Sequence, residues 1–141
     1  MSGADFLDSN VFVYLFDESD RRKQQLAHRI VSRALETDGA CISFQVVQET
    51  LNVLTRKFAR RANAGFAAAF LRDSLAPLWR VFPSPALYER GIALHQSLGF
   101  AFYDSLIVAA ALEAGCKRLL SEDLRHGQRI DGMRIENPFK P

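Results

Sequence analysis

The spacing of apolar residues changes repeatedly along the chain, and each change marks the border of an expected element. Short apolar runs between turn residues predict strands at 4–7, 40–44, 79–82 and 118–123. Apolar residues that recur every three or four positions predict helices at 11–16, 20–37, 45–61, 63–77, 85–99 and 102–116. We expect an irregular connection over 124–130 and a closing edge strand over 133–139.

This order of elements predicts an α/β protein with a three-layer α/β/α arrangement. Strands that alternate with helices usually form a central, mostly parallel sheet that helices cover on both faces. Ligands of such proteins usually bind in the crevice at the carboxyl ends of the strands. The side chains at those strand ends are therefore the first candidates for a functional site.

Length and composition indicate one globular unit. The 141 residues are expected to form a single domain over 1–141, because a chain of this length can bury one sizeable core. Its longest aliphatic run, 106–112, is far shorter than the roughly 18 residues of a membrane span, and no basic and apolar leader begins the sequence. We expect a cytoplasmic protein that does not enter a membrane.

The basic residues and the cysteines narrow the choice of partners. The net charge is only +2, but 14 of the 18 basic residues are Arg, whose planar fork suits phosphate groups. Cys41 and Cys116 stand in apolar stretches without the CxxC or CxH spacing of a zinc site. They are interpreted as reduced core residues rather than as part of a disulfide framework.

Asp8 is the first polar residue with an unusual setting. It lies within the apolar stretch FLDSNVFVYLF, where the strand at 4–7 gives way to the helix at 11–16, and Ser9 and Asn10 are the expected caps of that helix. Burial of an ionised carboxylate is costly, so the group needs a proton or a counter-ion. We expect a cationic group beside it.

Three further acids occupy comparable places in the predicted fold. Asp123 ends a strand, Glu49 lies early in the helix after a strand, and Asp104 opens the helix that leads into the last buried strand. Together with Asp8 they could face one crevice, and oxygen-rich clusters are what hard divalent cations select. Each acid alone also has a simpler explanation: charge at a helix N-terminus for Asp8 and Asp104, a turn for Asp123, and a solvated helix face for Glu49.

Four segments in this order resemble the PIN-domain ribonucleases, and particularly the VapC-type toxins of bacterial toxin–antitoxin pairs. They are FLDSNVFVY, QVVQETLNVL, FYDSLIVAAAL and LLSEDL. The resemblance covers essentially the whole chain. It implies a PIN-like α/β/α fold, an endoribonuclease that depends on Mg²⁺ or Mn²⁺, frequent formation of homodimers, and neutralisation by a cognate VapB-type antitoxin.

The resemblance also assigns roles to individual residues. The four catalytic and metal-binding acids that it implies are Asp8, Glu49, Asp104 and Asp123. Residues expected to support them are Asn10, which matches the polar residue after the first acid, together with Ser43 and Glu122. Family members often continue the fourth motif as acid, any residue, acid, Phe, whereas Leu124, Arg125 and His126 follow Asp123 here. Glu122 could therefore share or take the role of Asp123.

A basic stretch continues the helix that carries Glu49 and is a candidate track for the RNA backbone. Its members are Arg56, Lys57, Arg60 and Arg61. A solvated helix end that is favoured by the helix dipole explains them equally well. His126 lies near the acidic strand end, and we expect it at the surface or in contact with RNA rather than on a metal.

Other enzyme classes fit the sequence less well. The DxDx(T/V) pattern of haloacid-dehalogenase-like phosphatases fails, because Asn10 and Phe12 occupy its later positions. Neither the GxSxG nucleophile elbow nor the GxGxxG or GxxxxGK(S/T) phosphate loops occur. Two alternatives within the family remain open: a housekeeping PIN nuclease without an antitoxin, and a non-catalytic PIN-like module that binds RNA or protein.

Overall fold

The fold is built on a six-stranded sheet in the part of the chain that the computed structural model describes, residues 4–56 and 64–141. Its strands are β1 (Asp5–Leu7), β2 (Ala40–Ser43), β3 (Trp79–Val81), β4 (Arg118–Leu120), β5 (Arg129–Ile130) and β6 (Met133–Glu136). They lie in the order β3-β2-β1-β4-β6-β5, and every pair is parallel except β5 with β6. The expectation of a mostly parallel sheet is confirmed.

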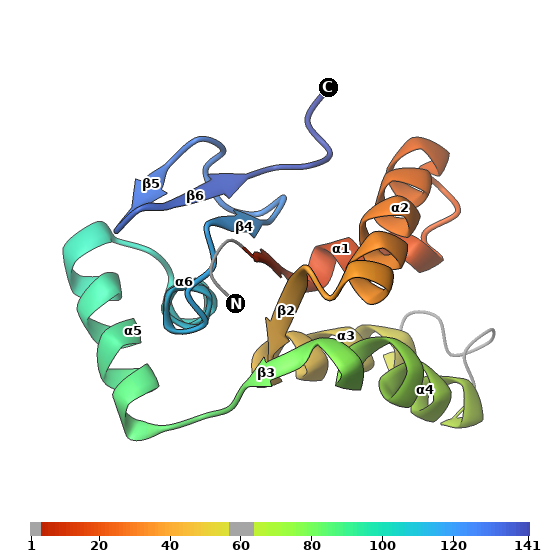
Figure 1. The fold of residues 1–141 in the computed structure, drawn as a ribbon, viewed down its shortest axis with the longest axis horizontal. Helices are drawn as coiled ribbons and strands as arrows, with labels where there is room; N and C mark the ends of the chain where they lie inside the picture. The colour runs from red at the N-terminus through yellow and green to blue at the C-terminus, as the bar shows by residue number, and fades with distance from the viewer. Residues whose placement is uncertain (1–3, 57–63) are drawn as a thin grey trace.

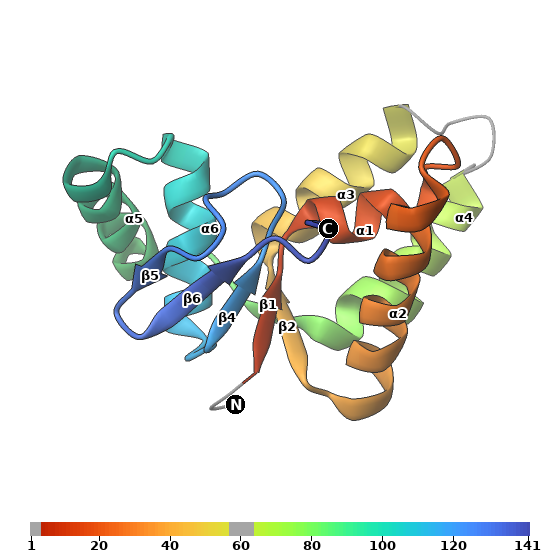
Figure 2. The same ribbon diagram turned by 90° about the horizontal axis from the view of Figure 1, so that it is seen from above.

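Helices cover both faces of this sheet, as the prediction of three layers requires. They are α1 (Ser9–Val13), α2 (Arg21–Thr37), α3 (Phe44–Arg56), α4 (Ala64–Phe70), α5 (Pro85–Leu98) and α6 (Phe102–Glu113). Helices α5 and α6 lie on one side of the sheet, and α1, α2 and α4 lie on the other (Figures 1 and 2). Helix α6 is buried from Ser105 to Ala111, which explains why its sequence is apolar almost all round.

The close packing of α5 on α6 depends on one glycine. A β-carbon at Gly91 of α5 would lie 2.6 Å from Cδ2 of Leu106, well inside van der Waals contact. The absence of a side chain at this position therefore lets the two helices approach. In the described residues no single helix is long and apolar enough to cross a membrane, and only α5 and α6 taken together, bent by 118°, reach that length and composition.

Several element borders differ from the sequence prediction. Asp8, rather than Ser9 or Asn10, caps the helix that follows β1, because its carboxylate accepts the backbone N–H of Ser9. That helix is α1 followed by a 3₁₀ turn, η1 (Tyr14–Phe16). Helix α2 ends at Thr37, because Asp38 adopts the left-handed conformation with φ 57°. Aspartate residues thus stand at both of these helix ends, Asp8 as a side-chain cap and Asp38 through its backbone conformation.

The helix predicted for 63–77 is less regular than expected. Its described part begins as α4 and continues as a π-helical segment, η2 (Leu71–Leu75), and a 3₁₀ turn, η3 (Ala76–Leu78). Pro77 lies in the 3₁₀ turn, where its missing N–H makes the end of regular helix favourable. Apolar spacing alone does not reveal such changes in helix type.

The predictions for the C-terminal segment were wrong in two respects. The strand within 133–139 is β6, and it lies between β4 and β5 rather than at the edge. The edge strand is β5, which forms inside the segment 124–130 that was expected to be irregular. The pair is a tight antiparallel hairpin with Ile130 opposite Met133, and Asp131 and Gly132 both have positive φ. The Asp-Gly pair was the turn signal that the prediction overlooked.

Candidate active site

The candidate site lies where the strand order reverses. Strand β1 has β2 on one side and β4 on the other, and ligands of parallel α/β sheets usually bind at the carboxyl ends of the strands at such a reversal. The backbone N–H of Asp8, directly after β1, donates to the carbonyl of Leu120 at the end of β4 over 3.0 Å. Asp8 and the residues after Leu120 therefore share one edge of the sheet.

Asp8 is a buried carboxylate held by neutral donors. Its Oδ1 accepts the N–H of Ser9 at 2.7 Å, its Oδ2 accepts the hydroxyl of Ser121 at 2.7 Å, and its side chain is almost fully buried. Burial raises the pKa of Asp8 to about 6 against these two bonds, and the negative charges of Glu49 and Asp123 raise it further.

The expected cation beside Asp8 is absent. No Lys, Arg or His of residues 4–56 and 64–141 forms an ion pair with it. Instead, hydrogen bonds from the backbone N–H of Ser9 and the hydroxyl of Ser121, together with a raised pKa, reduce the cost of burying the carboxyl group of Asp8. Neutral donors of this kind cannot be recognised by charge in a sequence.

Glu49 is joined to Asp8 through Ser9. The hydroxyl of Ser9 donates to Oε1 of Glu49 at 3.1 Å, while its own N–H binds Asp8. On the other side, the amide of Gln45 lies 3.4 Å from Oε2 of Glu49 and 3.0 Å from the carbonyl of Tyr103. Glu49 is half-buried, so the interpretation as a solvated helix face does not describe it. Gln45 links it to the first turn of α6.

Asp104 reaches the site from that first turn of α6. It is half-buried, and its pKa is raised first by burial and then by the negative charge of Asp123. A carboxylate in the first turn of a helix is also favoured by the helix dipole, so the simpler explanation holds alongside a functional one. The electrostatic influence of Asp123 on both Asp8 and Asp104 nevertheless brings the three acids into one cluster.

Glu122 and Asp123 point to different partners. Strand β4 ends at Leu120, so both acids lie in the bend after the strand rather than within it. Asp123 is exposed, and its Oδ2 accepts the amide of Asn10 at 3.2 Å. Glu122 instead accepts the hydroxyl of Tyr14 and the ammonium of Lys23, each at 2.5 Å. Of the two, Asp123 is the one directed to the other acids.

The ion pair of Glu122 anchors this bend to the helices on one side of the sheet. Lys23 of α2 also approaches the hydroxyl of Tyr14 at 3.2 Å and lies 5.0 Å from the centre of its ring. The hydrogen bond that Lys23 donates to Glu122 raises the pKa of Lys23 well above its ordinary value. Glu122 thus holds the chain segment that carries Asp123, a structural role that a motif comparison cannot distinguish from a catalytic one.

Ser121 is a residue of the site that the sequence analysis missed. It is fully buried, donates to Asp8, and accepts the N–H of Asp123 at 3.2 Å. One hydroxyl therefore aligns two of the four acids. Its position at a predicted strand end beside two acids was the signal that could have identified it. The roles of Ser9 and Gln45 in the site were also missed. Charged residues were chosen as candidates, and neutral hydrogen-bond donors were not.

The two other candidates for supporting the acids, Asn10 and Ser43, differ in their hydrogen bonds. Asn10 donates to Asp123, and its Oδ1 accepts the N–H of Glu122 at 3.3 Å, so it holds the bend after β4 at both acids. Ser43 is fully buried at the end of β2, and its hydroxyl finds no hydrogen-bond partner among the described residues. In the described part of the chain Ser43 therefore makes no hydrogen bond to the acids that it was expected to support.

The candidate RNA-binding residues are only partly described. Arg56 is exposed in the last turn of α3, whereas Lys57, Arg60 and Arg61 lie outside the described residues. Glu49 and Arg56 are seven residues apart, which places them on the same side of α3 roughly 10 Å apart along its axis. His126 is exposed, and its Nδ1 accepts the N–H of Asn137 at 3.0 Å, which leaves Nε2 to carry the proton of the neutral ring.

Comparison with known proteins identifies the family. The sequence profile described as PIN domain matches residues 6–131. The chain belongs to the PIN domain family. The family expected from the four acidic segments is thereby confirmed, although no curated protein matches the chain in sequence.

Solved structures share the fold of this PIN domain at low sequence identity. A toxin–antitoxin complex from Klebsiella pneumoniae contains a chain that is 22% identical with a TM-score of 0.66, and the match covers 96% of this chain and 98% of that one. VapC20 of Mycobacterium tuberculosis, described as a sarcin-ricin loop cleaving toxin, is 20% identical with a TM-score of 0.60 over 85% and 92% of the two chains. VapBC2 from Rickettsia felis, bound to a DNA fragment from its promoter, gives 16% identity and a TM-score of 0.67 over 94% and 97%.

The acids of this PIN domain suit a divalent metal ion by their chemistry. Within residues 4–56 and 64–141, no three carboxylate, imidazole or thiolate groups stand in the arrangement of a finished metal-binding site. The donor set is nevertheless all oxygen, and the repulsion of Asp8 by the negative charges of Glu49 and Asp123 raises the pKa of Asp8. A hard cation that enters this crevice relieves that repulsion, so the residues present fit Mg²⁺ or Mn²⁺.

Proposed function

We propose that this PIN domain is a metal-dependent endoribonuclease that acts as the toxin of a toxin–antitoxin pair. One observation carries the proposal: a buried carboxylate with a pKa of about 6, Asp8, lies among further acids at the switch point of the sheet. Strongly perturbed acids in such a crevice are typical of functional sites rather than of structural ion pairs. Family membership supports the same conclusion.

The four acids hold the metal ion in this proposal. Mg²⁺ or Mn²⁺ supplies positive charge that offsets the charge of the scissile phosphate and of the attacking and leaving oxygens. The protein keeps the carboxylates in place: Ser121 and the N–H of Ser9 hold Asp8, the hydroxyl of Ser9 holds Glu49, and Asn10 holds Asp123. The hydrogen bonds to Asp8 favour its ionised form, which is the form that binds a cation.

Positive side chains beyond the acids bind the RNA backbone. Arg56 follows Glu49 on the same side of α3, and we include Lys57, Arg60, Arg61 and the exposed His126 as further contacts. In this proposal the phosphate chain passes Arg56 on its way to the acidic crevice. The protein is proposed to act in the cytoplasm as a homodimer.

The proposed partner is a VapB-type antitoxin encoded beside this chain. Two of the structural neighbours are described as toxin–antitoxin or VapBC assemblies, which supports such a partner. An antitoxin that places an Arg or Lys among the four acids substitutes its charge for that of the metal ion. Inhibition is then competition for the carboxylates.

The experiment that tests the nuclease compares the purified chain with Asp8→Asn on a structured RNA, with Mg²⁺, with Mn²⁺ and with EDTA. We expect cleavage only with metal, at least about 100-fold slower cleavage by the variant, and a melting temperature that rises with Mn²⁺ in the wild type alone. The matched control is Glu36→Gln, an exposed acid on α2. Undiminished cleavage in EDTA contradicts the metal requirement, and absence of cleavage under every condition favours a non-catalytic PIN module.

Co-expression tests the antitoxin separately. We expect the neighbouring protein to restore growth, to co-purify with this chain and to reduce both its RNA cleavage and its Mn²⁺ binding. If the chain cleaves RNA but the neighbouring protein neither binds nor inhibits it, a housekeeping PIN nuclease is the better description.

A further inference from the structure

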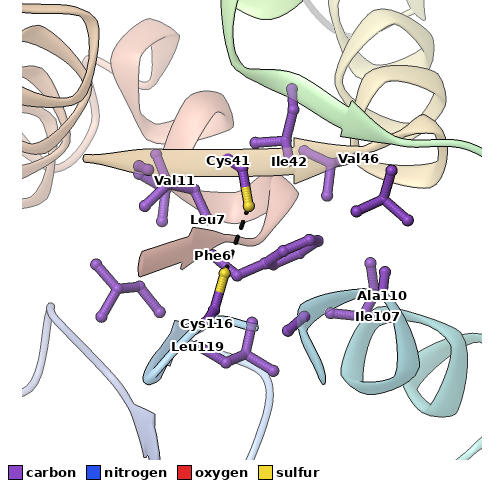
Figure 3. Packing of buried hydrophobic residues seen from close by; sticks show 14 of the residues in the cluster. Phe6, Leu7, Val11, Cys41, Ile42, Val46, Ile107, Ala110, Cys116 and Leu119 are labelled. Atoms are coloured by element: carbon purple, nitrogen blue, oxygen red, sulfur yellow. Dashed lines mark hydrogen bonds between the residues drawn. The ribbon is translucent and has the colours of Figure 1, made fainter. Parts of the chain in front are cut away.

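The two cysteines meet across the central strand, although 75 residues separate them in sequence. Cys41 is the second residue of β2, Cys116 lies two residues before the start of β4, and these two strands flank β1. Their sulfur atoms lie 3.4 Å apart, and Figure 3 shows them facing each other beside Phe6. Both are free thiols and both are buried. The sequence predicted buried, reduced cysteines, but not that they touch.

A covalent bond between the two sulfur atoms needs the chain segments that carry them to move closer together. A disulfide requires the sulfur atoms to approach to about 2.05 Å, which is a short further movement from a contact of 3.4 Å. Cys116 follows Gly115 in the turn between α6 and β4, and Gly115 has a positive φ of 72° with open space where a β-carbon would lie. This turn is the segment that has to adjust when the bond forms.

A small pocket gives access to Cys41. It has a volume of about 160 Å³ and is lined by Ala4, Cys41, Arg80, Val81, Glu113 and Ala114. This volume is several times that of one water molecule, so the pocket admits hydrogen peroxide. Arg80 is held over the start of β2 by Asp38 and by the carbonyl of Ala40, 3.3 Å from its Nη1.

The two thiols differ in their surroundings. The pocket is lined by Cys41 and not by Cys116, and either sulfur can donate in their contact. This contact and the positive charge of Arg80 lower the pKa of Cys41, although burial opposes them. Cys41 is therefore the sulfur that more readily carries a negative charge, and a thiolate is the reactive form.

We propose that Cys41 and Cys116 form an oxidation site, at which hydrogen peroxide converts the two thiols into an intramolecular disulfide. The sulfur of Cys41 attacks one peroxide oxygen, the O–O bond breaks, and the released hydroxide takes the thiol proton to leave as water. The sulfur of Cys116 then attacks the sulfenic acid on Cys41, and its proton leaves with the hydroxyl group as a second water. Two thiols and one peroxide give one disulfide and two waters, with two electrons passed from sulfur to oxygen.

The bond would tie β2 to β4 across β1. It closes a long loop of chain, which restricts the unfolded state and raises the melting temperature by several degrees. Cys41 and Cys116 lie toward the amino ends of these strands, whereas the acids follow the carboxyl ends of β1 and β4. The site is therefore independent of the proposed nuclease function, and its test does not require RNA.

The test uses the reduced, purified full-length chain, a small excess of hydrogen peroxide, and alkylation after denaturation. We expect the intact mass to fall by two hydrogen atoms, a non-reduced peptide map to show Cys41 joined to Cys116, and dithiothreitol to reverse both. The melting temperature of the oxidised protein should exceed that of the reduced protein. Cys116→Ser should instead accumulate a sulfenic acid on Cys41 that dimedone traps, and Cys41→Ser should leave Cys116 as a thiol.

The wild-type mass measurement decides the matter even if the serine variants fold poorly. Full alkylation of both cysteines after peroxide treatment overturns the proposal. So does a product in which the disulfide joins two chains, or in which Cys116 is oxidised while Cys41 is not.

Discussion

Ser121 donates a hydrogen bond of 2.7 Å from its hydroxyl to Oδ2 of Asp8, across the border between β4 and β1. The same hydroxyl accepts the backbone N–H of Asp123 at 3.2 Å. A neutral side chain thus fixes one acid directly and positions the backbone of a second. Because the bond to Asp8 favours the ionised carboxylate, it opposes the effect of burial on the pKa of Asp8.

Ser121→Ala should slow RNA cleavage at pH 7 by about 10-fold, since a hydrogen bond to a charged group contributes roughly 1.5–3 kcal/mol. Without this donor the pKa of Asp8 should lie above its present value of about 6, so the acidic limb of the pH–rate profile should move to higher pH. Part of the lost rate should return at pH 8.5. Rates measured from pH 5 to 9 check this.

Ser105→Ala is the matched control for this variant. Ser105 is also fully buried, but its hydroxyl donates only to the carbonyl of Ala101, at 3.2 Å. We expect a loss of stability without a shift of the acidic limb. An unmoved limb in Ser121→Ala would mean that the titration of Asp8 does not limit the rate.

Asp8→Asn should stabilise the metal-free protein at neutral pH. The native state holds the proton of Asp8 up to about pH 6, whereas the unfolded chain releases it near 3.8. The unfolded state therefore binds fewer protons between these values, and the free energy of unfolding of the wild type falls as the pH rises through this window, by about 3 kcal/mol. Asparagine does not ionise, so the variant avoids this fall in the free energy of unfolding.

Urea unfolding in EDTA at pH 4 and pH 7.5 measures the effect. The difference between Asp8→Asn and wild type should be small at pH 4 and should favour the variant by up to about 3 kcal/mol at pH 7.5. Equal stability differences at the two pH values would contradict a buried, raised carboxyl at this position.

Asp123→Asn and Glu122→Gln should separate catalysis from stability. We expect Asp123→Asn to lose at least about 100-fold in cleavage rate, comparable to the loss of another preorganised electrostatic group, with little change in stability. Glu122→Gln should keep most of the activity and lose at most about 1 kcal/mol of stability, because its ion pair with Lys23 is partly exposed.

A double-mutant cycle with Lys23→Met tests the second half of this prediction. The stability losses of Glu122→Gln and Lys23→Met should not add, since both variants break one ion pair. A larger loss of activity in Glu122→Gln than in Asp123→Asn would exchange the roles of the two acids.

Arg56→Gln should weaken RNA binding and flatten its dependence on salt. Each phosphate contact that is lost on a single strand should reduce the slope of log K against log salt by about 0.7. Binding to Asp8→Asn protein at several salt concentrations measures this without cleavage. Arg29→Gln, an exposed arginine on α2, is the control, and an unchanged slope in Arg56→Gln would assign Arg56 to a solvated helix end.

The parts of the fold that the sequence predicted well are those in which one face or the whole element is buried. The strand before Asp8 and the all-round apolar helix α6 are examples, because burial leaves a clear apolar pattern. The borders were less predictable. Asp8 and Asp38 replaced the expected residues at two helix ends because local hydrogen bonding and a left-handed backbone decide such ends.

Only some residues of the candidate site could be predicted from the sequence. The acids were recognisable because charge is conspicuous at an apolar strand end, but the sequence does not say which neutral groups serve them. Ser9, Gln45 and Ser121 act over sequence separations of up to 113 residues, and only the folded chain brings their donors to the carboxylates. The sequence also did not show that the side chain of Glu122 points away from the other acids. Its orientation depends on hydrogen bonds from Tyr14 and Lys23, which belong to other elements.

The reversal of strand order between β1 and β4 has a consequence for the timing of biosynthesis. The acids come from four separate stretches, the first at Asp8 and the last at Asp123, and the strand that supports the last one pairs directly with the first strand of the chain. A ribosome that has not yet produced β4 therefore carries a nascent chain with an incomplete crevice. The proposed nuclease site is therefore assembled only after translation has passed Asp123.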